Sequence, residues 1–188
     1  VLDRVRGCFV SLWADRAIAY RHQQGFDHSQ AAMAVVVQQM VPSETAGVGF
    51  SINPVNGQLG EMVINANFGL GESVVSGEGQ VDHFVLDRST RAVRSATIAQ
   101  KASKVVAASS GTEEVRLSGE EGRQACLTPA QLTELAALLL QVEASYRFPQ
   151  DIEWGFAGGR LHLLQSRPIT TIPPRWTRDE SAERFPNV

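Results

Sequence analysis

The stretch PQDIEWGFAGGRLHLLQSRPITT, residues 149–171, contains two alternating runs joined by glycines. Asp151 and Glu153 alternate with apolar residues before the glycines, and Gln165 and Arg167 end the run that follows them. Alternation of polar and apolar residues is typical of β-strands that bury one face. The stretch therefore predicts an antiparallel hairpin that carries polar side chains along one of its faces.

The register of this hairpin depends on the length of its turn. We expect a three-residue turn, residues 157–159, because it supplies glycine where φ must be positive. This register places Glu153 opposite Leu163 and Asp151 opposite Gln165, so that the polar side chains share one face. A two-residue turn would instead put Glu153 and Gln165 on opposite faces, because a shift of one residue moves every side chain to the other face.

The chemistry of these polar residues suits a phosphate site. Carboxylate and carboxamide oxygens are suitable ligands for Mg²⁺. A guanidinium group can grip phosphate with two parallel hydrogen bonds, and metal plus arginine is the recurring arrangement for phosphoryl transfer. The alternative is an edge hairpin that faces water with an ordinary Asp–Arg ion pair, which is common in antiparallel sheets.

The composition is that of a soluble folded chain. The 188 residues are 43% hydrophobic and 20% charged, with a formal net charge of -3. This balance indicates no nucleic-acid surface, and no apolar run approaches the roughly 20 residues of a membrane span. Cys8 and Cys126 are far apart in the sequence, so we expect buried free thiols in a reducing, cytoplasmic compartment.

Two amphipathic helices are predicted. Apolar residues at three- and four-residue spacing predict the first over residues 3–24, with Gly25 as its stop signal. The second, residues 128–146, begins with a capping box formed by Thr128 and Gln131.

Alternating or β-branched runs predict further strands at residues 33–41, 46–54 and 60–68 and a hairpin over 82–99. The run MAVVVQQMV, residues 33–41, has the composition of a buried strand. Residues 69–77 are interpreted as a loop, and residues 99–124 are too weakly patterned to place. Mixed helices and strands without βαβ alternation predict an α+β fold, a largely antiparallel sheet packed with two main helices.

The environment of four other side chains follows from the same patterns. Trp13 and Trp154 both belong to apolar patterns, one in the first predicted helix and the other in the last hairpin. We therefore expect both in the core rather than stacked on a ligand. Lys101 and Lys104 lie in the polar, weakly patterned segment, so we expect both to be solvated.

Four stretches between residues 35 and 171 carry a family resemblance: VVVQQMVPSETAGVGFSINPVNG, INANFGLGESVVSG, PQDIEW and LLQSRPITT. Together they resemble the ATP-binding domain of the pyruvate phosphate dikinase and phosphoenolpyruvate synthase superfamily, which includes the rifampin phosphotransferases. The resemblance implies an ATP-grasp fold, with residues 1–172 as its second lobe. It also implies that residues 173–188 are an exit linker toward a missing downstream domain.

The resemblance assigns roles to the polar hairpin residues. It implies that Glu153 and Gln165 hold Mg²⁺ on the ATP phosphates. It implies that Arg167 contacts the phosphates and has a catalytic role. Asp151 would then orient the metal ligands without binding the metal itself.

Two further ATP-binding residues follow from the resemblance. Gln38 would reach the adenine edge, together with backbone groups near Met40, although Gln38 could also be a strand-end residue in water. Glu72 would lie near the phosphates, although it could also cap the following segment. The glycines before Glu72 do not form a Walker A loop, because no Gly-Lys-Ser/Thr follows them.

The implied function is that of a dikinase-type phosphotransferase. ATP would give its β-phosphoryl group to a histidine on a swivelling domain, and then to an acceptor such as pyruvate or a rifamycin hydroxyl. The first ATP-grasp lobe and the swivelling domain are absent from this sequence, so we expect the chain alone to be inactive. The alternative is a degenerate structural or interaction module, against which the intact set Glu153, Gln165 and Arg167 argues.

Overall fold

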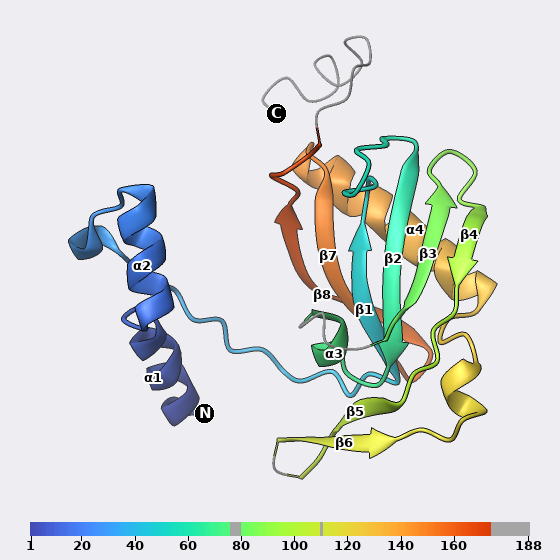
Figure 1. Cartoon of the computed structure of the whole chain (residues 1–188), viewed down its shortest axis with the longest axis horizontal. Helices are drawn as coiled ribbons and strands as arrows, with labels where there is room; N and C mark the ends of the chain where they lie inside the picture. Colours follow the sequence, from blue (N-terminus) through green and yellow to red (C-terminus); the bar gives the residue numbers. More distant parts are fainter. Residues whose placement is uncertain (76–79, 110, 174–188) are drawn as a thin grey trace. The chain divides into compact units, whose positions relative to one another are not determined.

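The computed structural model describes residues 1–75, 80–109 and 111–173. The chain divides into two compact units, Val1–Met40 and Val41–Val188, each of which is described by itself (Figure 1). Within the described ranges, no helix combines the length and the apolar character needed to cross a membrane.

The first unit contains two helices where one continuous helix was predicted. α1 spans Leu2–Ser11 and α2 spans Asp15–Gln24. They are separate because Ala14 has extended backbone dihedral angles, φ -67° and ψ 146°. Arg21 stabilises the connection, since its Nη2 donates a hydrogen bond to the carbonyl oxygen of Leu12 at 2.6 Å.

Other predictions for this unit had mixed outcomes. Gly25 ends α2 in the left-handed conformation, with φ 69°, as predicted. Trp13 is 58% exposed, so its predicted place in a core is wrong, and Cys8 is exposed rather than buried. The ring of Trp13 instead lies under the guanidinium of Arg21, 5.5 Å from its centroid. After α2 the short helix η1, His28–Gln30, completes the unit's helical elements in the described residues.

The predicted buried strand over residues 33–41 is wrong. Residues 31–43 contain neither strand nor helix, and Val36 and Val37 are 83% and 68% exposed. A β-branched run favours extended backbone, but a strand also needs a hydrogen-bonded neighbour. No described strand pairs with this segment.

The second unit is built on a six-stranded sheet in the order β4-β3-β2-β1-β7-β8, with every neighbouring pair antiparallel (Figure 1). β5 and β6 form a separate two-stranded antiparallel sheet. These sheets confirm the predicted α+β fold. The strands are β1 Thr45–Phe50, β2 Glu61–Phe68, β3 Asp82–Asp87, β4 Val93–Thr97, β5 Ser103–Ala107, β6 Thr112–Arg116, β7 Gln150–Ala157 and β8 Arg160–Pro168.

Helices lie on both faces of the six-stranded sheet. α4, Pro129–Tyr146, lies behind the sheet in Figure 1 and α3, Glu72–Val75, lies in front of it. The capping box of Thr128 and Gln131 at the start of α4 is confirmed. α3 corrects the prediction of a loop over its residues. A short helix η2, Glu121–Arg123, lies before α4.

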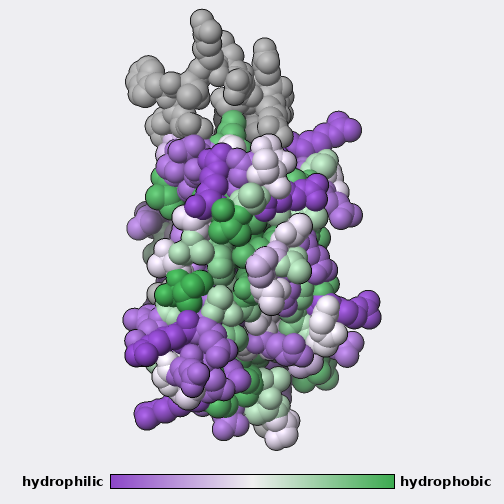
Figure 2. All heavy atoms as spheres, turned by 90° about the vertical axis from the view of Figure 1, so that its right-hand side faces the viewer, coloured by the Kyte–Doolittle hydropathy of each residue, from purple (hydrophilic) through white to green (hydrophobic). Residues whose placement is uncertain are grey.

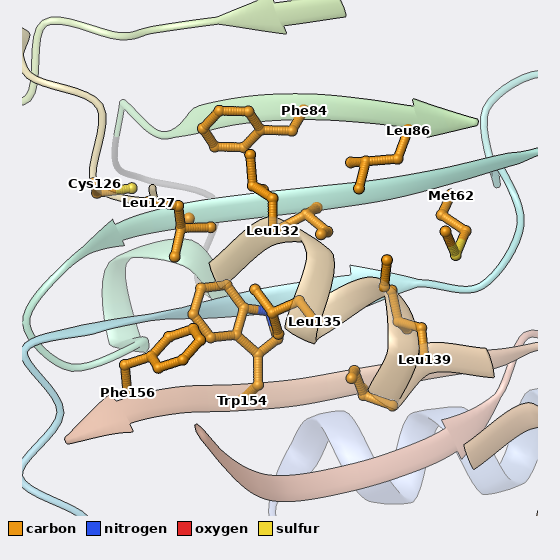
Figure 3. Close-up of a cluster of buried hydrophobic side chains, with 14 of the residues drawn as sticks. Met62, Phe84, Leu86, Cys126, Leu127, Leu132, Leu135, Leu139, Trp154 and Phe156 are labelled. Atoms are coloured by element: carbon orange, nitrogen blue, oxygen red, sulfur yellow. The ribbon is translucent and has the colours of Figure 1, made fainter. Parts of the chain in front are cut away.

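The core lies between α4 and one face of the sheet (Figure 3). Trp154 is fully buried there, as predicted, and its ring packs edge-on against Phe156 with centroids 5.8 Å apart. Aromatic and aliphatic side chains of this size dominate the energetics of a core. The buried cluster comprises Met62, Ile64, Ala66, Phe84, Leu86, Cys126, Leu127, Leu132, Leu135, Ala136, Leu139, Val142, Ile152, Trp154 and Phe156.

The two outer strands of the sheet, β4 and β8, carry features that discourage pairing with another chain. Every residue of β4 is exposed, and the side of the molecule on which β4 lies mixes hydrophobic and hydrophilic surface (Figure 2). The ladders β3–β4 and β7–β8 each contain a bulge. Bulges and charged side chains are the usual means of protecting sheet edges.

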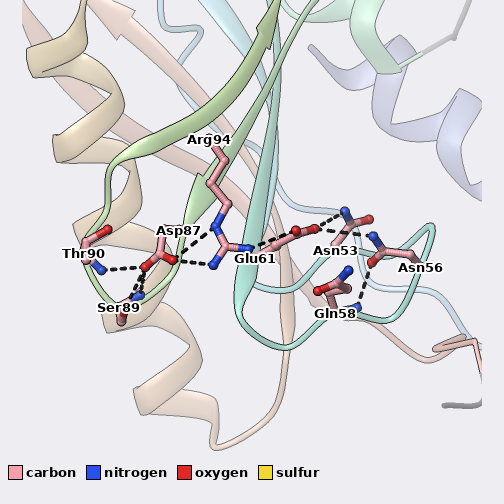
Figure 4. A network of polar contacts seen from close by, with 8 residues as sticks. All are labelled: Asn53, Asn56, Gln58, Glu61, Asp87, Ser89, Thr90 and Arg94. Carbon is pink, nitrogen blue, oxygen red and sulfur yellow. Dashed lines mark hydrogen bonds and ion pairs between the residues drawn. The ribbon is translucent and has the colours of Figure 1, made fainter. Parts of the chain in front are cut away.

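A polar network ties the loop after β1 to the turn between β3 and β4 (Figure 4). Arg94 contacts Asp87 Oδ2 at 2.5 Å and Glu61 Oε1 at 3.1 Å. Asn53 Nδ2 donates to Glu61 Oε2 at 2.8 Å, and Ser89 donates to Asp87 through both its backbone N–H and its hydroxyl.

This network predicts acid sensitivity. The hydrogen bond from Asn53 lowers the pKa of Glu61 below its ordinary 4.5, and that from Ser89 lowers the pKa of Asp87 below 3.8. Carboxyls with depressed native pKa values stabilise the fold above their unfolded pKa, and this contribution is lost as pH falls through the lower native value. Urea unfolding should show stability falling below about pH 4.5, more steeply for the wild type than for Glu61→Gln. Equal slopes would contradict the assignment.

Candidate functional site

The face of the sheet turned away from α4, here called the open face, carries the predicted polar residues. Consecutive pairings align Gln165, Glu153, Val48, Asn65 and His83 in one row across five strands. Directly paired residues project to the same side of a sheet. The neighbours of Glu153 in β7 belong to the core cluster, so this row points away from the core.

The next row along the strands brings Arg167 and Asp151 together. Arg167 pairs with Asp151, which in turn pairs with Phe50 of β1. All four predicted polar residues of the last hairpin therefore share the open face, which confirms their predicted common orientation.

The predicted turn of this hairpin is wrong. Ala157 pairs with Arg160, which leaves a two-residue turn of Gly158 and Gly159. Their φ angles are 56° and 72°. Two consecutive positive φ values define a type I′ turn, which glycine adopts most easily and which matches the twist of antiparallel strands.

A β-bulge restores the common face that a two-residue turn would otherwise remove. Trp154 pairs with Leu163, but the next pair is Glu153 with Gln165. Leu164 is therefore the extra residue of β8, and the alternation of side chains shifts by one at this point. The predicted pairings of Glu153 with Leu163 and of Asp151 with Gln165 are wrong, but the predicted common face of Glu153 and Gln165 is confirmed.

Glu153 and Gln165 have unused oxygens. Within the described residues, neither side chain has a hydrogen-bond partner, and Gln165 is exposed while Glu153 is half-buried. The described part of the chain holds no group of three His, Cys, Asp or Glu that could enclose a metal by itself. Mg²⁺ in nucleotide sites binds one or two protein oxygens and completes its octahedron with phosphates and water. The pair fits a Mg²⁺ ion shared with a nucleotide.

Asp151 holds Arg167 in place. Arg167 Nε donates to Asp151 Oδ2 at 2.7 Å, and Asp151 is 7% exposed whereas the Arg167 side chain is 65% exposed. This hydrogen bond raises the pKa of Arg167 above its ordinary value. The bond uses Nε, and among the described residues the two terminal nitrogens have no partner. They remain available for a phosphate group.

Glu72 lies on the same face. It is the exposed first residue of α3. A Cβ on Gly71 would lie 3.6 Å from the Cβ of Ala46, and Ala46 pairs with Gly155, two residues after Glu153 in β7. The structure therefore places every predicted phosphate residue of the second unit on the open face.

Gln38 and Met40 are exposed and belong to the first unit. The strand that was expected to present Gln38 is absent from the structure. The adenine role of these two residues stays a prediction.

The segment before Glu72 is fixed by backbone hydrogen bonds. Gly69 N–H donates to Glu44 at 2.7 Å, and Leu70 N–H donates to Val105 of β5 at 2.7 Å. Gly69 has φ 77°, and a Cβ at this position would lie 2.1 Å from the carbonyl oxygen of Val105. Only glycine fits both the dihedral angle and this close approach.

Gly69→Ala should therefore lower the free energy of unfolding by at least about 2 kcal/mol, because it adds a backbone clash to an unfavourable φ. Gly159→Ala is the matched control, since Gly159 has φ 72° but no atom within 4 Å of the added Cβ. Urea unfolding of both variants separates the two contributions. Equal losses in the two variants would show that the backbone at Val105 moves away from the added methyl group at no cost in free energy.

Lys101 was expected in solvent, and this prediction is wrong. Its side chain is fully buried and its Nζ lies 2.6 Å from Asp82 Oδ1. The two residues are 19 positions apart, and their proximity depends on the fold of the segment between them. No local sequence pattern marks the pair.

Comparison with known proteins identifies a family. Residues 1–185 match the family described as pyruvate phosphate dikinase, AMP/ATP-binding domain. The chain is 40% identical over 97% of its length to the phosphoenolpyruvate synthase of Pyrococcus furiosus, covering 24% of that protein. It is 36% identical over 93% of its length to the rifampicin phosphotransferase of Bacillus cereus, covering 20% of that protein. The chain thus spans less than a quarter of the length of these relatives.

Proposed function

The chain belongs to the pyruvate phosphate dikinase AMP/ATP-binding domain family, and on this basis we propose that it is the second lobe of an ATP-grasp domain in a dikinase-type phosphotransferase. The observation that carries the proposal is the pairing of Glu153 with Gln165 beside the Arg167–Asp151 ion pair. A relative named phosphoenolpyruvate synthase and one named rifampicin phosphotransferase are each 40% identical to the chain. Family membership therefore supports a nucleotide site and does not specify the final phosphoryl acceptor.

Each side chain of the pair has a defined role in this proposal. Glu153 and Gln165 would hold Mg²⁺ on the ATP phosphates through their side-chain oxygens. When bound, the ion supplies positive charge that neutralises the phosphoryl oxygens. Arg167, oriented by Asp151, uses its terminal nitrogens to bind the phosphates and stabilises the charge that develops during transfer.

Two further roles belong to the proposal, one in each unit. In the second unit, Glu72 on the open face lies beside the phosphates. In the first unit, Gln38 and the backbone near Met40 are proposed to bind an adenine edge. In the whole enzyme the β-phosphoryl group passes to a histidine on a swivelling domain, with AMP as the leaving group and with the γ-phosphoryl group transferred to water or phosphate. From the histidine the β-phosphoryl group passes to an acceptor such as pyruvate or a rifamycin hydroxyl. The first ATP-grasp lobe and that domain are the partners this mechanism requires.

The chain by itself should bind nucleotide weakly. Its open face leaves bound phosphates in contact with water on one side, which screens their interactions with Arg167. Titration calorimetry should detect ATP binding with a dissociation constant on the order of a millimolar, dependent on magnesium. No turnover is expected. The absence of any binding at millimolar Mg-ATP would contradict a nucleotide site on this chain, and ATP turnover by the chain alone would contradict its proposed inactivity.

A further inference from the structure

A buried ion pair lies outside the proposed site. Lys101 Nζ contacts Asp82 Oδ1 at 2.6 Å and donates to the carbonyl oxygens of Gln124 at 2.8 Å and Ala99 at 3.3 Å. Nζ also lies 5.3 Å from the ring centroid of Phe68. A buried ammonium group with this many partners is held in one position, because any displacement leaves a charge without compensation.

Asp82 joins both ends of the segment that carries β5 and β6. Its Oδ1 accepts a hydrogen bond from the backbone of Ala99 at 3.0 Å, and its Oδ2 accepts one from Cys126 at 2.8 Å. Lys101 closes the segment further, since its own N–H donates to the carbonyl of Gly122 at 2.9 Å. The segment from residue 99 to residue 126, here called the β5–β6 segment, is thus anchored at one point of the sheet.

The β5–β6 segment in turn contacts the backbone that leads to Glu72. Val105 accepts the hydrogen bond from Leu70, and Gly69 forms a parallel bridge with Val105. Glu72 begins α3 two residues after Leu70. The backbone at Gly69 is thus held between Glu44, next to β1, on one side and β5 on the other.

We propose that Lys101 is a positioning residue for the nucleotide site: by anchoring the β5–β6 segment on Asp82, it fixes where β5 holds the backbone before Glu72. The inference rests on the proposed function for its effect on Mg-ATP. The structural connection from Lys101 through β5 and Val105 to Leu70 does not depend on that function. Supporting residues that lock the backbone of a binding residue commonly decide whether that residue is correctly placed.

Three variants of the 188-residue chain test this inference. Lys101→Met removes the charge and keeps the length of the side chain. Gly122→Ala leaves the side chains of Lys101 and Asp82 unchanged but adds a Cβ that would lie 2.1 Å from the carbonyl oxygen of Lys101. Arg88→Met is the matched control, because it also breaks a buried ion pair, with Glu143. None of the hydrogen bonds and ion pairs of Arg88 in the described residues involves the β5–β6 segment.

The first readout is amide hydrogen exchange by NMR, under conditions where circular dichroism shows every variant folded. After correction for each variant's global stability, exchange at Leu70 should accelerate about tenfold in Lys101→Met and in Gly122→Ala, and not in Arg88→Met. An unchanged rate at Leu70 in the first two variants overturns the inference. An equal acceleration in all three also overturns it, because Lys101 would then contribute only general stability.

The second readout is the dissociation constant for Mg-ATP. Lys101→Met should weaken binding roughly 3- to 30-fold, and a Glu72→Gln substitution added to it should weaken binding no further. Full additivity of the two losses overturns the link from Lys101 to Glu72. If the wild-type chain binds no Mg-ATP, the proposed function fails and the link to nucleotide fails with it, whereas the exchange rate at Leu70 still decides whether Lys101 positions that backbone.

Discussion

Arg88→Met will lower the free energy of unfolding by about 3–5 kcal/mol, because it leaves a buried carboxylate without its partner. Arg88 contacts both oxygens of Glu143, at 2.5 and 2.8 Å, and donates to the carbonyl of Ser51 at 2.7 Å. The Arg88 and Glu143 side chains are 12% and 6% exposed. The pair joins the turn after β3 to α4 and to the loop after β1.

The measurement is urea unfolding, with Arg94→Met as the control. Arg94 also forms ion pairs, but its side chain is 45% exposed, so water replaces much of the lost interaction and the loss should be far smaller. The double variant Arg88→Met/Glu143→Leu should recover much of the stability, because it removes the stranded charge as well. If Arg88→Met costs no more than Arg94→Met, the pair is not desolvated in the native state.

Glu153→Ala will weaken the affinity for Mg-ATP at least tenfold, because it removes the carboxylate paired with Gln165 on the open face. Glu134→Ala is the control, since Glu134 is an exposed residue of α4, on the other side of the sheet. Calorimetric titrations of both variants give the comparison. The loss at Glu153 should shrink when magnesium is omitted, because its proposed ligand is then absent. Equal affinities of the two variants would remove Glu153 from the site.

Local signals predicted part of this fold. The capping box and apolar stripe of α4 involve residues within a few positions of each other, so they can be identified without the tertiary structure. The polar face of the last hairpin has the same origin, because alternation in each strand already assigns Asp151 and Glu153 to one side.

Tertiary pairing decided the remainder. Glycines at 158 and 159 permit more than one turn length, and the position of the bulge at Leu164 has no marker in the sequence. The β-branched run over residues 33–41 favours extended backbone, but composition does not show whether a partner strand exists. Lys101 was predicted to be solvated because its local sequence is polar. Only the tertiary structure brings it next to its partner, Asp82.

The family resemblance supplied what spacing did not. Spacing indicated that oxygens and a guanidinium share a face, which is compatible with a solvated edge hairpin. The family supplied the identity of the ligand, and the structure supplied the orientation of Glu153, Gln165 and Arg167 on one face.

The most direct test of the proposed site is paramagnetic broadening of the Gln165 side-chain amide by Mn²⁺ in the presence of ATP. Mn²⁺ favours the same oxygen ligands as Mg²⁺ and broadens only nearby NMR signals. We predict broadening of this amide and of the Glu153 backbone signal when both Mn²⁺ and ATP are present, with loss of the effect in Glu153→Ala. Broadening centred on the carboxylates of Glu61 and Asp87, or broadening at Gln165 that persists in Glu153→Ala, would contradict the proposed site.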